Sequence, residues 1–164
     1  GMAYNQRNMR QEAWECLNKA NNMLQSNNPV VLARLGITAL DIPDYEEDGL
    51  ENIRKAIELM QPDKEMMFTI YFSLGDYYVT RDVKKGIEYF HMAESYKPND
   101  ANMLYQIGYC YFMAGNEDKE YQYWSRYLES MGEDSDDIVV SSVKNVLKKI
   151  REKRFMEGKE EKPQ

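Results

Sequence analysis

The side chains that most often carry catalysis are scarce in this chain. Among its 164 residues are a single histidine, His91, and two cysteines, Cys16 and Cys110. A redox thiol pair needs close spacing such as Cys-x-x-Cys, and two cysteines are too few for a disulfide framework. The sequence also has no glycine-rich phosphate loop, paired His-Glu metal spacing or nucleophile elbow. It therefore predicts a protein that is not an enzyme and that keeps both thiols buried and reduced.

Two acidic clusters raise the question of calcium binding. They are Tyr45-Glu46-Glu47-Asp48 and Glu133-Asp134-Ser135-Asp136-Asp137. A calcium loop needs oxygen ligands at alternating positions, a central glycine and a terminal glutamate, and neither cluster has that spacing. We interpret both as solvated turns or helix starts, and we expect neither a metal nor a cofactor.

The overall charge and hydropathy indicate which classes of partner are expected. Net charge is −7, which argues against nucleic acid, because binding there depends on neutralising phosphates with Lys and Arg. No apolar run approaches the roughly 18 residues that span a bilayer. Gly1-Met2 is typical of the remnant of a cleaved tag, and the polar residues that follow do not form a signal peptide. We therefore expect a cytoplasmic protein without a membrane contact; a removed signal segment is the alternative.

The hydrophobic pattern predicts an all-helical chain. Apolar residues recur every three or four positions, whereas a strand would alternate every two. Four of the five prolines fall between the segments with this pattern. Asn99-Asp100 and Asn116 are candidate N-caps. The expected helices span about 6–25, 30–40, 47–60, 63–79, 83–96, 100–114, 117–131 and 136–155.

A repeat of about 36 residues organises these helices. A Leu-Gly or Ile-Gly pair ends at Gly36, Gly75 and Gly108, at intervals of 39 and 33 residues. A mid-helix glycine costs about 1 kcal/mol relative to alanine, so three of them indicate places where a partner helix comes close. A large apolar residue of the second helix follows the same period: Leu17, Ile53, Phe90 and Trp124.

With these residues the chain resembles the tetratricopeptide repeat (TPR) family, departing from its pattern at Ala39, Glu120 and Tyr127. The resemblance implies a TPR-like right-handed α-solenoid of three helical hairpins with an extra N-terminal helix and a C-terminal capping helix. We expect a single domain over 6–156, with hairpins at about 29–62, 63–98 and 100–132 and the capping helix at 136–156. Residues 1–5 are expected to be flexible and 157–164 disordered.

The resemblance places ligand binding on the concave face, which is formed by the first helix of each hairpin. Here that face carries apolar and aromatic residues, whereas a clamp for a terminal carboxylate would need several cations and amides. We therefore predict a groove for a peptide or protein segment with apolar anchors, chiefly Phe72, Tyr105, Tyr109 and Phe112. The predicted groove residues are Val30, Ala33, Ile37, Thr69, Phe72, Asp76, Val79, Asn102, Tyr105, Tyr109, Phe112 and Met113.

Two alternatives to this function remain open. The groove could be filled by the chain itself or by a second copy in a homodimer. The length, acidity and layout are also similar to those of the class II chaperones of type III secretion. This similarity to the chaperones is one of organisation, and no sequence motif is shared with them.

The last helix offers a second candidate surface. Its apolar stripe is expected to consist of Val139, Val143, Val146, Leu147 and Ile150 and to cover the third hairpin. Its cations are either a solvated face near a helix C-terminus or a docking site for an acidic partner. The candidate docking residues are Lys144, Lys148, Lys149 and Arg151.

Overall fold

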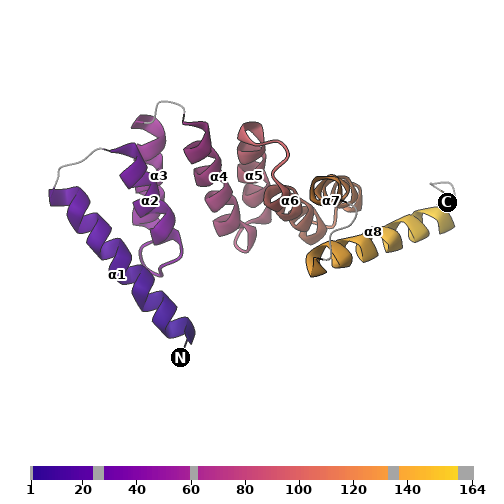
Figure 1. Ribbon diagram of the computed structural model, residues 1–164, viewed down its shortest axis with the longest axis horizontal. Helices are drawn as coiled ribbons and strands as arrows, with labels where there is room; N and C mark the ends of the chain where they lie inside the picture. Colours follow the sequence, from indigo (N-terminus) through magenta and orange to yellow (C-terminus); the bar gives the residue numbers. More distant parts are fainter. Residues whose placement is uncertain (1, 24–27, 60–62, 133–136, 159–164) are drawn as a thin grey trace. The chain divides into compact units, whose positions relative to one another are not determined.

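The described parts of the chain are helical. The computed structural model describes residues 2–23, 28–59, 63–132 and 137–158, and the side chains from residue 9 onward. Within these ranges the helices follow one another without a strand, which confirms the all-α prediction (Figure 1). They are α1 (Met2–Met23), α2 (Pro29–Leu40), α3 (Glu46–Leu59), α4 (Lys64–Val79), α5 (Val83–Tyr96), α6 (Ala101–Met113), α7 (Glu117–Met131) and α8 (Ile138–Met156).

The helix ends agree with the capping chemistry of the sequence. The Asp100 side chain accepts a hydrogen bond from the Met103 amide, and that of Asn116 accepts one from the Lys119 amide. Helix α1 differs from the prediction because it begins at Met2, within the stretch expected to be flexible. Most of the second acidic cluster and the tail from residue 159 lie outside the described residues.

Contacts divide the chain into two compact units, a first unit of Gly1–Tyr77 and a second unit of Tyr78–Gln164. The boundary lies near the end of α4, inside the second predicted hairpin. The single domain expected from the sequence remains a prediction.

In the first unit, α2 and α3 form a close helical hairpin. A Cβ at Gly36 would lie 2.5 Å from Ile53 Cγ1 and 2.7 Å from the Gly49 carbonyl oxygen, so only glycine allows the two backbones to approach this closely. Helix α1 packs beside α2 through Trp14, which is buried. The cluster around this indole ring consists of Trp14, Leu35, Ala39 and Ile42, with Val31 and Tyr45 packed against it.

In the second unit, α5 packs against α6, α6 against α7, and α7 against α8. Helices α6 and α7 approach each other closely at Gly108, because a Cβ there would overlap the Trp124 indole ring. The same Leu/Ile-Gly position thus receives the large apolar residue of the second helix in both units, at Gly36 with Ile53 and at Gly108 with Trp124. Fully buried Phe90, Leu104 and Ile107 form the core around these helices.

Helix α8 repeats the apolar pattern of the first helix of a hairpin, such as α6. Its buried Val140, Val143 and Leu147 have the spacing of Leu104, Ile107 and Tyr111 in α6. The predicted stripe was wrong by one residue at its start, because Val139 is 40% exposed and Val140 is buried. At the position equivalent to Gly108 stands Lys144. Helix α8 therefore packs like the first half of another hairpin but carries a cation where a second helix would approach.

Among the described helices, none combines the length and the apolarity that a bilayer crossing requires.

Candidate functional site

The clearest candidate site is an exposed aromatic surface on α6. We call Tyr105, Tyr109, Phe112 and Met113 the α6 surface. Tyr109, Phe112 and Met113 are 37%, 53% and 56% exposed, whereas neighbouring Ile107 and Cys110 of the same helix are fully buried. Large exposed apolar side chains that gather on one element are typical of an interaction surface.

The rings of the α6 surface rest on a fixed support. Tyr105 and Phe112 both stack on Trp124 of α7, each with ring centroids 6.2 Å apart. The Trp124 indole is itself held, because its Nε1 donates a hydrogen bond to the Tyr105 carbonyl oxygen at 3.2 Å. Tyr109 contacts Phe112 at 6.3 Å between centroids. These contacts fix the orientation of the rings before any ligand binds, which lowers the entropy lost on binding.

Two other predicted groove residues lie in the second unit. Asn102 is exposed near the start of α6, and Val79 is half-buried at the end of α4. Asn102 therefore presents a polar side chain on the same helix as the α6 surface. Tyr105 is half-buried because it packs between Trp124 and Tyr127, so it serves the core as well as the surface.

The predicted groove residues of the first unit differ in exposure. Val30 and Thr69 are exposed, and Ile37 is half-buried. Phe72 is also half-buried and contacts the ring of Phe68 at 5.7 Å. Ala33 is fully buried and offers no surface to a ligand.

A pocket of about 510 Å³ brings some of these residues together in the first unit. Ile37 of α2 and Thr69 of α4 share it with Leu17 of α1, an apolar residue that the sequence placed in the repeat pattern and not in a site. The full lining is Leu17, Arg34, Ile37, Thr38, Asp63, Glu65, Met66 and Thr69. Its lining combines apolar side chains with charged groups of both signs, so it is suited to an amphipathic segment.

Asp76 is the one carboxylate among the predicted groove residues, and its pKa is perturbed. It lies on the exposed side of α4, yet its carboxyl is partly surrounded by protein. This burial, together with the negative charge of Asp41, raises the pKa of Asp76 to about 6. A pKa displaced in this way marks a carboxylate without enough compensating donors.

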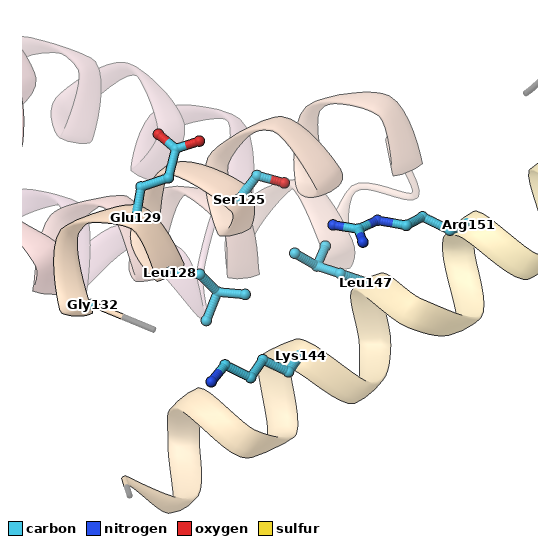
Figure 2. A pocket seen from close by; sticks show the side chains of 7 residues that line it. All are labelled: Ser125, Leu128, Glu129, Gly132, Lys144, Leu147 and Arg151. Atoms are coloured by element: carbon cyan, nitrogen blue, oxygen red, sulfur yellow. The ribbon is translucent and has the colours of Figure 1, made fainter. Parts of the chain in front are cut away.

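A second candidate site is the groove between α7 and α8, with a volume of about 590 Å³ (Figure 2). We call it the α7–α8 groove, lined by Ser125, Leu128, Glu129, Gly132, Lys144, Leu147 and Arg151. Leu128 and Leu147 face each other across it, while Lys144 and Arg151 extend toward α7. The groove therefore combines an apolar floor with two cations.

The repeat pattern explains why this groove is open. Ser125 and Leu128 stand 34 residues after His91 and Glu94, and Lys144 stands 36 residues after Gly108. In the preceding repeat, the equivalent space is filled by α7, whose Tyr123 hydroxyl donates to Glu94 at 3.1 Å. The α7–α8 groove is thus the place that the second helix of a further hairpin would occupy. Sequence reasoning missed its α7 side, although the 34-residue offset from His91 and Glu94 was a usable signal.

The predicted docking cations of α8 fall into two groups. Lys144 and Arg151 line the α7–α8 groove, and the Arg151 Nε donates to the Tyr121 hydroxyl at 2.6 Å, which holds the guanidinium in place. The Lys148 Nζ lies 3.9 Å from the Glu152 Oε1 on the exposed side of α8, and Lys149 is also exposed.

The basic end of α8 is docked on the acidic start of α7. Lys153 pairs with Glu117 at 2.7 Å, and Arg154 pairs with Asp118 at 2.8 Å. The guanidinium of Arg154 also lies over the Tyr121 ring, 4.6 Å from its centroid. Part of the basic charge on this helix therefore stabilises the α7–α8 packing.

The single histidine belongs to a hydrogen-bond network between α5, α6 and α7. The His91 Nδ1 lies 3.0 Å from a Glu94 carboxylate oxygen, and its Nε2 lies 3.0 Å from the Tyr111 hydroxyl. Arg126 donates to Glu94 at 2.7 Å and to the Pro98 carbonyl oxygen at 2.8 Å. No role for Glu94 or Arg126 was expected from the sequence, because their pairing across 32 residues is visible only once the helices are packed.

The charges of this network are balanced. Burial alone would raise the pKa of Glu94, but hydrogen bonds from Arg126, His91 and Tyr123 and the Arg126 charge hold it below its usual value. Burial and the Glu94 charge raise the pKa of Tyr123 to about 12. All of these groups have partners within the network, so the arrangement joins helices.

The cysteines differ from each other. Cys110 is buried in α6, as predicted, but Cys16 is exposed and the prediction for it was wrong. Cys16 lies on the side of α1 that faces away from Trp14 and α2.

Comparisons with known proteins bear on the fold. No protein-family model and no curated protein matches the chain. Among solved structures, the chain is similar to the crystal structure of the MamA protein, a TPR-containing protein. The TM-score is 0.60 at 20% sequence identity, and the match covers 100% of this chain and 93% of that one. The chain therefore has a TPR-like helical-repeat fold.

Proposed function

We propose that this protein is a non-catalytic protein–protein interaction module. It binds a peptide or protein segment that inserts apolar side chains at the α6 surface. The observation that supports this most is the exposure of Tyr109, Phe112 and Met113 above the fixed Trp124 ring. Rigid aromatic side chains give a large contact area for little loss of side-chain freedom, and such residues dominate binding energy in protein interfaces.

The test is capture of a partner by variants of the α6 surface. Phe112→Ala removes an exposed ring, so folding is expected to be retained. Loss of a central anchor should weaken binding by about 2 kcal/mol, a factor of about 30 in affinity. A pull-down from the source cell identifies the partner, and titration calorimetry with that partner gives the affinity.

Phe155→Ala is the matched control, because Phe155 of α8 is also an exposed phenylalanine, 44% accessible. If Phe112→Ala and Met113→Ala bind the captured partner as tightly as the control does, the α6 surface is not the binding site. Circular dichroism of each variant separates loss of binding from loss of helix.

A second candidate function is supported by the α7–α8 groove. We propose that it binds an acidic segment whose carboxylates pair with Lys144 and Arg151 and whose apolar residue packs against the half-buried Leu128. Charge complementarity of this kind mainly sets specificity and association rate. Binding at this groove should weaken strongly with added salt, whereas binding at the α6 surface should not.

Arg151→Gln and Lys144→Gln separate the two sites. Each should lower the affinity for an acidic partner, whereas Lys64→Gln, which removes an exposed lysine in the first unit, should not. Equal affinities for all three variants would exclude the groove as the binding site.

A homodimer with an occupied groove and a chaperone similar to those of type III secretion remain predictions, as does the cytoplasmic location.

A further inference from the structure

Helix α1 carries an apolar face that the first unit leaves uncovered. Met9, Ala13, Cys16, Ala20 and Met23 follow one another at intervals of four, three, four and three residues. All five are exposed, Met9 to 68% and Met23 to 76%. Alternating steps of four and three place side chains in one line along a helix, and this is the spacing of a coiled-coil seam.

The packing of α1 explains why this face is open. Trp14 fixes the helix to α2 and is buried among Leu35, Ala39 and Ile42. Trp14 and Cys16 are two positions apart, which puts their side chains about 200° apart around the helix axis. The body of the first unit therefore lies on the side of α1 opposite the uncovered face, and a second helix could approach that face without meeting α2.

We propose that this face pairs with the same face of a second copy, with the two α1 helices antiparallel. Cys16 stands at the centre of the line, so a two-fold axis beside it makes the surface self-complementary, as a symmetric dimer requires. In that arrangement Met9 meets Met23 of the second copy, and Ala13 meets Ala20. Large side chains pair at the two ends, and small ones allow close approach in the middle.

The charges beside the seam select the antiparallel direction. Glu12 and Lys19 are both exposed and flank the same edge of the seam, seven residues apart. Antiparallel pairing brings this edge of one helix against the same edge of the other. The Glu12 of each copy then faces the Lys19 of the other copy, so the dimer contains this charge pair two times. A parallel pair would place Glu12 opposite the other edge, where apolar Leu17 lies. Charge complementarity thus identifies a second copy of this chain as the occupant.

The first test is the oligomeric state of the full chain and its charge variants by sedimentation velocity over a concentration series. The chain should form a dimer, and Glu12→Lys and Lys19→Glu should each weaken it about tenfold, because each replaces two attractions by two repulsions. The double variant exchanges the two charges and should restore the dimer. Glu15→Lys is the matched control, because it makes the same charge change on α1 outside the seam.

The second test is cross-linking at Cys16 with a short bismaleimide. The two-fold axis should bring the two Cys16 thiols together, so the reagent should yield a covalent dimer that Cys16→Ser abolishes. The buried Cys110 of α6 serves as the internal negative site. Phe112→Ala should leave the dimer unchanged, since this pairing does not involve the α6 surface and can fail or hold independently of the proposed function.

Three results would overturn the proposal. They are a monomer throughout the concentration series, a double charge variant no tighter than the single variants, and a dimer that Cys16 does not cross-link. Circular dichroism shows whether a weakened variant has kept its helices. Ala13→Glu, which places a charge within the seam, is a further seam variant that should also weaken the dimer.

Discussion

Glu94 shows how one carboxylate can join three helices. It lies on α5 and receives hydrogen bonds from Arg126 and Tyr123 of α7, while His91 links it to Tyr111 of α6. Only 18% of its side chain is exposed, so loss of the carboxylate leaves Arg126 without its charge partner in a largely buried place.

We expect Glu94→Gln to lower the free energy of unfolding at pH 7 by about 2 kcal/mol. The folded-state pKa of Glu94 lies below its usual 4.5, so its stabilisation is complete above pH 4.5 and is lost as pH falls through the folded value. As the pH falls below about 5, the free energy of unfolding should therefore decrease less for the variant than for the parent protein. Urea unfolding across that range measures this, with Glu88→Gln, an exposed glutamate on the same helix, as control; parallel curves for parent and Glu94→Gln would contradict it.

For Asp76, ionisation of the carboxyl has the opposite effect on the free energy of unfolding. Its pKa is raised from 3.8 to about 6, so the ionised carboxylate costs stability once pH rises through that interval. We expect Asp76→Asn to stabilise the protein by about 1 kcal/mol at pH 7.5, allowing for solvent screening, and to have no effect below pH 3.8. Thermal unfolding at both pH values gives the comparison, and Glu58→Gln on α3 provides an exposed control. A stabilisation that persists in acid would argue for a cause other than charge.

At the scale of the element, α8 depends on the packing of one face. Leu147 is 2% exposed and lines the α7–α8 groove together with Leu128, whereas Val139 at the start of the same helix is 40% exposed. Ion pairs at the other end of the helix are exposed on at least one side and add little each.

Leu147→Ala should therefore cost about 2–4 kcal/mol in unfolding free energy, because it removes buried methyl groups and leaves a cavity. Val139→Ala is the matched control and should cost less than about 1 kcal/mol. Chemical denaturation gives both values, and hydrogen exchange should show the loss of protection in α8 and α7. Equal costs for the two variants would mean that α8 is not held by this face.

The elements themselves were largely predictable from sequence. The intervals between Gly36, Gly75 and Gly108 and the three- and four-residue apolar periodicity predict the helices, and the structure places their ends within a few residues of expectation. The exposure of individual groove residues was not predictable, because it depends on where side chains of other helices end. Ala33 is fully buried, and Tyr105 is shared between surface and core for this reason.

At the scale of the whole molecule, the two units have separate cores. Leu35 is fully buried in the first unit and Ile107 in the second. In repeat proteins stability is a sum of local terms and neighbour contacts, so damage to one part is felt most by the elements next to it.

We expect Leu35→Ala to lower amide protection in α1–α3 by at least tenfold while α6–α8 change less, and Ile107→Ala to do the reverse. Each substitution should remove about 2–4 kcal/mol locally. Native-state hydrogen exchange read by mass spectrometry resolves the two regions. A uniform loss of protection over both units, from either substitution, would show that the chain unfolds as one cooperative body and would favour the single domain predicted from the sequence.

Lys144 has a consequence for how such a chain can grow over evolutionary time. The other first helices have glycine at this place, at Gly36, Gly75 and Gly108, and a new second helix can lie only against a glycine or a similarly small residue. Adding a helix after α8 would therefore require a second event, the replacement of this lysine. Duplicating a whole internal hairpin requires no such change, because each copy keeps its own glycine at this place.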